Sequence, residues 1–141
     1  MAVRSSSAVW TGTLKKGLGS VSLGSGTFKG EYSFPSRFEE GKGTNPEELI
    51  GAAIAGCYSM ALAGALEQAG FVADKVETRA QVHIDKVGDG FTITAIELIV
   101  AAVVPRISEK LFLDRVEETR KGCPVARALT GTTISTKASL G

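Results

Sequence analysis

The stretch NPEELIGAAIAGCYSMALAGALEQ, Asn45–Gln68, limits what this chain can fold into more than any other feature. Thr44 or Asn45 suits a helix cap, Pro46 suits the first helical position, and two glutamates follow at the positive end of the helix dipole. The eighteen residues Leu49–Leu66 carry no charge, and a glycine then supplies a stop signal. The pattern predicts a helix about 35 Å long. Because this helix is apolar all round, we expect it to run through the middle of the molecule.

An uncharged run of this length also meets the lower threshold for a membrane-spanning helix. However, the run is built largely from alanine and glycine, and its flanks carry the acidic residues Glu47, Glu48 and Glu67. No asymmetry of lysine and arginine is present to orient it in a bilayer. We therefore expect a core helix in a protein that has no membrane partner.

Length, charge and cysteine content narrow the class of protein. A chain of 141 residues suits a single domain, residues 1–141, with one core. Sixteen basic and fifteen acidic residues leave a net charge of +1, so electrostatics gives no support for a nucleic-acid partner. The N-terminus lacks the apolar segment of a signal peptide, and the chain has only two cysteines. Both observations favour the cytoplasm, where cysteines are more often redox-active or structural thiols than a permanent disulfide.

Hydrophobic periodicity on both sides of the helix predicts an α+β fold. Val76–Asp85 alternates apolar and polar residues, which predicts a half-buried strand, and Phe91–Val104 predicts a second long strand. The apolar parity of the second strand shifts near Ala95, and either a bulge there or burial of both faces would explain the shift. Ser108 can cap a second helix that runs to about Lys121. Shorter strands are expected at Ala8–Leu14, in hairpins between Gly17 and Gly30, and at Thr132–Lys137.

The two cysteines occupy different predicted environments, and they lie too far apart for a CxxC redox motif. Cys123 precedes Pro124 and becomes the cap residue of a short helix, where backbone N–H groups and the helix dipole favour a thiolate. Cys57 lies near the middle of the apolar helix. A thiol there is inert unless a cation is brought to it.

Arg37 is the candidate cation, because a guanidinium stays charged on partial burial. It lies in Tyr32–Phe38, a segment that Pro35 is expected to keep out of regular structure. A buried arginine needs a carboxylate partner, and Glu47 is well placed in the first turn of the long helix. These residues alone favour a thiol-dependent redox enzyme only modestly.

Other interpretations of the cysteines stay open on the residues alone. On the residues alone, the default interpretation of Cys57 is a small buried hydrophobic residue, the usual role of a free cysteine, and the protein would then be a non-catalytic dimeric stress or small-molecule-binding protein. A hydrolase with Cys57 as acyl nucleophile lacks a histidine base, because His83, the only histidine, falls on the polar face of a strand. Two cysteines and one such histidine are also too few for a zinc site.

Three segments resemble the OsmC/Ohr family of organic hydroperoxide reductases. They are RFEEGKGTNPEELIGAAIAGCYSMAL (Arg37–Leu62), DKVGDGFTIT (Asp85–Thr94) and GCPVARAL (Gly122–Leu129). The resemblance runs through nearly the whole chain, and the RFE…KGTNPEEL form is closer to the OsmC branch than to the Ohr branch.

The resemblance implies an OsmC-like fold, in which a long central helix and a second helix pack on an antiparallel-rich sheet, and an intertwined homodimer with active sites at the subunit interface. It also implies a thiol peroxidase of oxidative and osmotic stress defence, with no metal, flavin or other cofactor. Cys57 matches the peroxidatic cysteine, Cys123 the resolving cysteine, and Arg37 and Glu47 the pair that activates the thiolate. An external dithiol would restore the thiols, and lipoyl-bearing proteins are the donors expected for some members.

Two expectations concern the surroundings of Cys57. The apolar residues Ile54, Tyr58 and Met60 are close in sequence and are expected to form a wall that favours organic hydroperoxides over hydrogen peroxide. On a straight helix, the ten residues from Glu47 to Cys57 span about 15 Å, which a glutamate side chain cannot cross.

Glu47 is therefore expected to reach Cys57 from the other subunit of a dimer. This requires two roughly antiparallel copies of the long helix to cross near Ala52. Gly51 and Ala55 are the small residues expected to allow the close approach.

Overall fold

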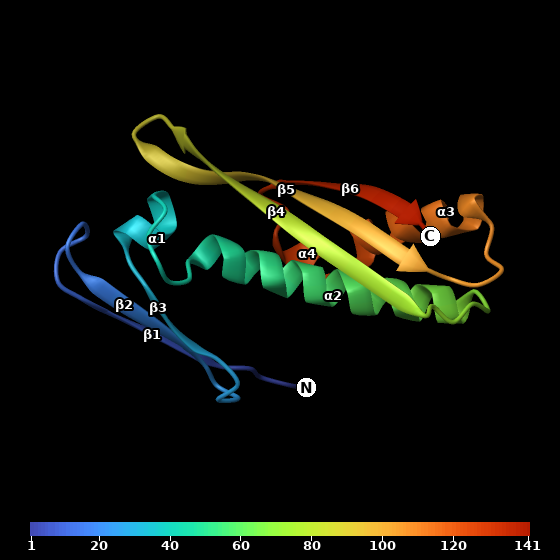
Figure 1. Ribbon diagram of the computed structural model, residues 1–141, viewed down its shortest axis with the longest axis horizontal. Coiled ribbons are helices and arrows are strands. Elements are labelled where there is room, and N and C mark those ends of the chain that lie inside the picture. The colour runs from blue at the N-terminus through green and yellow to red at the C-terminus, as the bar shows by residue number, and fades with distance from the viewer. The chain divides into compact units, whose positions relative to one another are not determined.

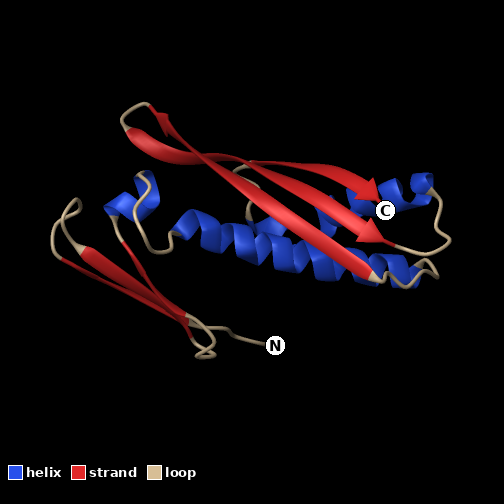
Figure 2. Cartoon of the chain, in the orientation of Figure 1, coloured by secondary structure: helices blue, strands red, loops and turns tan.

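The computed structural model describes residues 1–141 and divides them into two compact units, Met1–Leu49 and Ile50–Gly141, called here the N-terminal unit and the C-terminal unit (Figures 1 and 2). Each unit has a three-stranded sheet and helical segments. The predicted α+β class is confirmed. The single domain over residues 1–141 stays a prediction.

The N-terminal unit is an antiparallel sheet with the strand order β1–β2–β3. The strands are β1 (Ser6–Thr11), β2 (Leu18–Leu23) and β3 (Lys29–Tyr32). Gly19 of β2 pairs with Trp10 of β1 on one side and with Tyr32 of β3 on the other. This row of three residues brings two aromatic rings together over a glycine.

A short helix, α1 (Phe34–Phe38), follows the sheet and carries Arg37. The Ser33 and Ser36 hydroxyls each accept a hydrogen bond from the other residue's backbone N–H, at 3.2 and 2.8 Å, which forms a capping box. Pro35 is tolerated because it lies in the first turn, where a backbone N–H has no helical acceptor. The prediction that this segment is irregular is therefore wrong.

In the C-terminal unit, helices cover one face of a mixed sheet with the order β4–β5–β6 (Figure 1). The strands are β4 (Lys75–Val87), β5 (Gly90–Val103) and β6 (Thr133–Leu140). The helices are α2 (Pro46–Gln68), whose residues 46–49 belong to the N-terminal unit, α3 (Glu109–Gly122) and α4 (Pro124–Ala128). Strands β4 and β5 are antiparallel, whereas β5 and β6 are parallel. The register shifts where His83 faces Ala95 and Ile84 faces Ile93, which confirms the predicted bulge.

Helix α2 has the predicted length, but within this chain it buries only one face. Its completely buried residues are spaced by four: Ile54, Tyr58, Leu62 and Leu66. Met60, on another face, is 81% exposed. The expectation that α2 is buried on all sides is wrong for the single chain.

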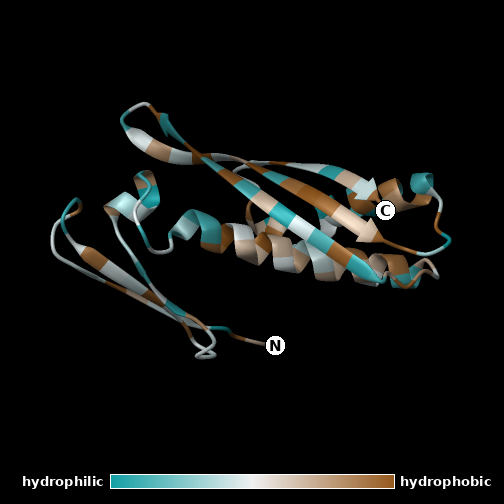
Figure 3. Ribbon diagram, viewed as in Figure 1, coloured by the Kyte–Doolittle hydropathy of each residue, from teal (hydrophilic) through white to brown (hydrophobic).

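The exposed part of α2 is as apolar as the buried part. In Figure 3 the helix is white to brown over most of its length, whereas β4 alternates between teal and brown. By length and composition α2 alone is apolar enough to cross a membrane, and 28% of its most apolar window is buried in the chain. The exposed face of α2 is therefore an apolar surface that nothing within this chain buries.

Candidate active site

The two cysteines lie side by side in the C-terminal unit although they are far apart in the sequence. The Cys123 thiol donates a hydrogen bond to the Cys57 sulfur over an Sγ–Sγ distance of 2.9 Å. Both are free thiols. Cys57 is partly exposed, whereas Cys123 is completely buried. A small reagent can therefore reach Cys57 first.

Local structure fixes both sulfur positions. Tyr58, next to Cys57, is fully buried, and its hydroxyl donates a hydrogen bond of 2.8 Å to the Val116 carbonyl, which ties α2 to α3. Cys123 ends α3 through a bond of 2.9 Å from its N–H to the Thr119 carbonyl, and Pro124 begins α4 directly afterwards. The junction of two helices thus presents the Cys123 side chain to the middle of a third.

Burial raises the pKa of the Cys123 thiol, and the hydrogen bond to Cys57 raises it further. The backbone N–H groups of Ala126 and Val125 act in the opposite direction but are outweighed. The expectation that the start of α4 favours a Cys123 thiolate is therefore wrong. A helix of five residues offers a weak dipole, and a completely buried sulfur loses its hydration.

The predicted pairing of Arg37 with Glu47 is present in the N-terminal unit. Arg37 Nη2 lies 2.8 Å and Nε 2.9 Å from Glu47 Oε1. The glutamate side chain is only 7% exposed and the arginine 38%. The second carboxylate oxygen, Glu47 Oε2, is buried without a hydrogen-bond partner. A carboxylate buried in this way holds the guanidinium in one orientation.

A second set of hydrogen bonds holds α1 against the start of α2. The Ser36 hydroxyl donates to the Thr44 carbonyl at 2.8 Å, and the Asn45 side-chain amide donates to the Ser36 carbonyl at 3.1 Å. Asn45 also caps α2 by accepting from the Glu48 N–H at 2.8 Å, as predicted. Sequence reasoning missed the role of Ser36. The spacing of Ser33 and Ser36, three residues apart, is the signal that predicts it.

The apolar wall expected beside Cys57 is largely absent. Ile54 and Tyr58 are completely buried in the core of the C-terminal unit, so they offer no surface to a substrate. Met60 is exposed. The expectation is therefore wrong for Ile54 and Tyr58, because a helix with one buried face turns these positions toward the sheet.

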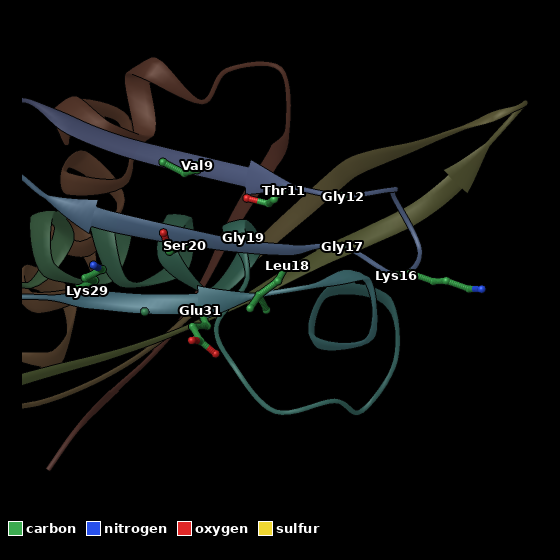
Figure 4. Close-up of a pocket in the computed structure, with 11 residues that line it drawn as sticks. Val9, Thr11, Gly12, Lys16, Gly17, Leu18, Gly19, Ser20, Lys29 and Glu31 are labelled. Atoms are coloured by element: carbon green, nitrogen blue, oxygen red, sulfur yellow. The ribbon is translucent and has the colours of Figure 1, made fainter.

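Two hollows flank the sheet of the N-terminal unit on opposite faces, as the alternation of side chains along a strand requires. One is a broad open depression of about 790 Å³ over β1 to β3, where Lys16, Lys29 and Glu31 supply the charges (Figure 4). The other, of about 240 Å³, is called here the aromatic pocket, and it is lined by Trp10, Leu14, Tyr32, Ser33, Phe34, Arg37 and Phe38. His83 is exposed, and no three side chains of His, Cys, Asp or Glu converge as metal ligands would.

The fold is α+β, and its candidate site is a partly exposed thiol in contact with a buried one. Together they indicate a protein of the two-cysteine thiol redox class. The family model described as OsmC-like protein matches residues 39–137, which include Glu47, Cys57 and Cys123. Peroxiredoxin OsmC of Escherichia coli (strain K12) is 47% identical over 123 residues, 86% of this chain and 86% of that protein. Peroxiredoxin OsmC of Shigella flexneri gives the same values. The chain therefore belongs to the OsmC-like protein family.

Solved structures agree on the fold. The organic hydroperoxide resistance protein OhrB of Bacillus subtilis superposes with a TM-score of 0.72 at 20% identity, over 96% of this chain and 98% of that chain. An OsmC-like protein of unknown function from Vibrio cholerae O1 biovar eltor superposes with a TM-score of 0.78 at 15% identity, over 99% and 100%. Both share the architecture with this chain.

Proposed function

We propose that the protein is a thiol-dependent peroxidase that reduces organic hydroperoxides to alcohols. The observation that carries the proposal is the 2.9 Å contact between the sulfur of the partly exposed Cys57 and the buried Cys123 thiol. Its support is the 47% identity to Peroxiredoxin OsmC and the shared fold with organic hydroperoxide resistance proteins.

The first step is the attack of the Cys57 thiolate on the terminal peroxide oxygen of ROOH. The O–O bond breaks, the hydroxyl group stays on sulfur as a sulfenic acid, and the alkoxide takes a proton and leaves as ROH. Cys57 performs this step because its sulfur is partly exposed and Cys123 is completely buried.

The second step joins the two sulfurs. The raised pKa of Cys123 keeps its thiol protonated near neutral pH. The Cys123 sulfur attacks the sulfenic sulfur, an S–S bond forms, and the thiol proton leaves with the sulfenic hydroxyl as water. An external dithiol then reduces the disulfide by exchange and becomes a disulfide itself. A lipoyl-bearing protein is the donor class proposed.

Arg37 and Glu47 are proposed to stabilise the Cys57 thiolate from the partner subunit of a homodimer. The structure pairs them within one chain, so they act as a unit. Glu47 and Cys57 lie ten residues apart on α2, about 15 Å along the helix, so a single chain cannot bring the pair to its own cysteine through α2. A second copy would also cover the open apolar face of α2.

The competing proposal is a non-catalytic protein of the same family, in which the two cysteines serve only in core packing. Consumption of cumene hydroperoxide with dithiothreitol as reductant separates the two, in the absence of NADPH, metal and flavin. A peroxidase consumes the hydroperoxide over many turnovers and releases the alcohol in equal amount. A rate equal to that of dithiothreitol alone would overturn the proposal. A cytoplasmic location and a role in stress defence are proposed with it.

A further inference from the structure

A small hollow in the C-terminal unit is lined by cations and by no carboxylate. It has a volume of about 260 Å³ and lies where the end of α3, the end of α4 and the start of β6 meet. It is called here the basic pocket, and its polar lining consists of Arg120, Lys121, Arg127, Thr130 and Thr132. Three positive charges and two hydroxyl groups therefore surround one hollow.

Arg120 is held in one orientation by the chain itself. Its Nη2 and Nε lie 2.6 and 3.0 Å from the two carboxylate oxygens of Glu117. Its Nη1 donates a hydrogen bond of 3.4 Å to the Ile134 carbonyl of β6. A guanidinium fixed on two sides in this way is already ordered, so a ligand that binds beside it has little side-chain entropy to remove.

The other two cations are not neutralised within the chain. Lys121 Nζ lies 3.9 Å from Glu117, whose carboxylate is already bound by Arg120. The exposed Arg127 side chain has no ion pair or hydrogen bond. Three cations and one carboxylate give this cluster a net charge of +2, which exceeds the +1 of the whole chain. The positive charge of the protein is therefore concentrated at the basic pocket.

The donors in the pocket suit oxyanions. The exposed Thr130 hydroxyl makes no hydrogen bond within the chain, so it can donate to a ligand. The Thr132 hydroxyl is directed to the Leu129 carbonyl, at 2.8 Å. A volume of about 260 Å³ equals that of about nine waters in the liquid. This is room for one or two carboxylate groups with their bound water.

The basic pocket adjoins the buried cysteine. Arg120 precedes Cys123 by three residues in the chain, and Arg127 follows it by four. The Arg127 N–H donates a hydrogen bond of 2.9 Å to the Cys123 carbonyl, so these two residues lie one helical turn apart, about 6 Å along the axis. A molecule that binds in the basic pocket is therefore a neighbour of the thiol pair.

We propose that the basic pocket docks carboxylate groups of the protein that reduces the Cys57–Cys123 disulfide, so that the electron donor is a dithiol carried on an acidic protein surface. This inference rests on the proposed peroxidase function and names the surface that its reducing partner binds. A lipoyl group on a lysine side chain fits this arrangement, because its flexible tether lets the dithiol reach the sulfurs while the carrier stays on the pocket.

The docked dithiol reduces the disulfide in two exchanges. One donor thiolate attacks the sulfur of the partly exposed Cys57, the S–S bond breaks, and Cys123 leaves and takes up a proton. The second donor thiol then attacks the mixed disulfide, which closes the donor's own disulfide and releases Cys57. Two electrons and two protons pass from the donor to this chain.

The test measures this reduction alone. Diamide converts the two thiols to the disulfide without any hydroperoxide. The donors are two synthetic peptides, each with one dihydrolipoyl-lysine, flanked by glutamates in one peptide and by lysines in the other. At an ionic strength of about 0.01 M the glutamate peptide should react about tenfold faster, and about 0.5 M salt should remove the preference. Equal rates for the two peptides at low salt would overturn the inference.

Two arginine variants locate the preference. Arg127→Glu reverses the unpaired charge in the basic pocket. Arg79→Glu makes the same change at an exposed position of β4 outside it. The ratio of the glutamate-peptide rate to the lysine-peptide rate should fall about fivefold in Arg127→Glu and stay constant in Arg79→Glu. The uncharged dithiothreitol should reduce all three proteins at one rate. An equal fall in both variants, or no fall in Arg127→Glu, would overturn the inference.

These measurements separate the inference from the function on which it rests. If the wild-type protein consumes no cumene hydroperoxide but its diamide-formed disulfide shows the charge preference, the peroxidase is refuted and the docking site is retained. If the protein is an active peroxidase whose disulfide shows no preference between the peptides, the docking site is refuted and the peroxidase is retained.

Discussion

At the scale of single residues, exposure separates the two cysteines more clearly than position in the sequence does. Cys57 is partly exposed, and Cys123 has no exposed surface, although their sulfurs are 2.9 Å apart. A peroxide can reach only the first. In the proposed reaction Cys123 therefore reacts only after the sulfenic acid has formed on Cys57 beside it.

The first prediction follows from this order. Cys57→Ser should abolish hydroperoxide consumption, because no exposed thiol remains. Cys123→Ser should release one equivalent of alcohol per chain and then stop, because the sulfenic acid has no partner. Quenched-flow measurement of alcohol per chain, with dithiol withheld, checks both. Release of one equivalent of alcohol per chain by Cys57→Ser would show that the roles are wrongly assigned.

The second prediction concerns pH. Burial raises the pKa of Cys123 above its ordinary value of 9.0 in the folded chain. Above pH 9.0 the unfolded chain therefore binds fewer protons than the folded chain. The stability that this thiol contributes is fully present below its unfolded pKa and is lost as the pH rises through the folded pKa, by at most about 1.4 kcal/mol per pH unit.

Urea unfolding of the reduced protein between about pH 7 and pH 10.5 measures this loss. Cys123→Ala should show a shallower decline of the unfolding free energy, because that proton is absent from both states. Burial raises the pKa of Tyr58 as well, so a decline at the alkaline end remains in both proteins. Identical pH profiles for the two proteins would contradict the assignment.

Part of the candidate site could be predicted from the sequence. The Arg37–Glu47 pair was predictable because a capped helix start fixes the glutamate and a short preceding segment brings an arginine within reach. The pKa direction of Cys123 was not, because it depends on burial by residues distant in the sequence. The burial of Ile54 and Tyr58 could not be predicted either, because the sequence of a helix that is apolar on all sides does not indicate which side is buried.

At the scale of elements, α1 shows how a short helix positions a charged side chain. Its five residues are too few for a stable isolated helix, so hydrogen bonds at its ends must hold it. The buried Ser36 hydroxyl provides two of them, by accepting from the Ser33 N–H and donating to the Thr44 carbonyl.

The third prediction tests this arrangement. Ser36→Ala leaves the Ser33 N–H and the buried Thr44 carbonyl without this partner, which should cost about 1–3 kcal/mol of stability. Because α1 then positions Arg37 less firmly, kcat for cumene hydroperoxide should fall. Ser25→Ala, at an exposed turn residue, is the control and should change neither quantity. If the stability falls by the predicted amount but kcat is unaltered, α1 does not position the arginine.

The strands could be predicted, but their pairing could not. The alternation in β4 and the shift of parity in β5 indicated two strands and a bulge. In a half-buried strand, apolar residues that face the core alternate with polar residues that face solvent, so the sequence shows which face is buried. The parallel pairing of β6 with β5 follows from the path of the chain through α3 and α4, which no local pattern records. Pro35 led to the prediction of an irregular segment, and the Ser33–Ser36 spacing that indicates the capping box of α1 was missed.

At the scale of the whole molecule, the open face of α2 is the feature that one chain leaves unexplained. Gly51 does not lie on that face, because a Cβ there would meet the Val82 side chain of β4 at 3.4 Å. The expectation that Gly51 allows two helices to approach is therefore wrong. Ala52, Ala53 and Gly56 are exposed instead, and a Cβ on Gly56 would meet nothing within 4 Å. These small residues permit a second α2 to come close.

The fourth prediction tests whether the activating pair comes from the partner subunit. Cys57→Ser and Glu47→Ala should each be inactive as homodimers. A heterodimer of the two combines the Cys57 of one chain with the intact Arg37–Glu47 pair of the other, so one site of two is complete. Because random exchange makes about half of the dimers mixed, an equal mixture should recover about a quarter of wild-type activity.

The structure supplies a matched control for this experiment. Arg37 and Glu47 of one chain bind each other directly, so Arg37→Ala and Glu47→Ala damage the same pair. A heterodimer of these two variants has no complete pair, and its mixture should stay inactive. Mixing Arg37→Ala with Cys57→Ser should recover activity as Glu47→Ala does. If exchange is demonstrated by mass spectrometry and neither Cys57→Ser mixture recovers, the pair does not act across the subunit interface.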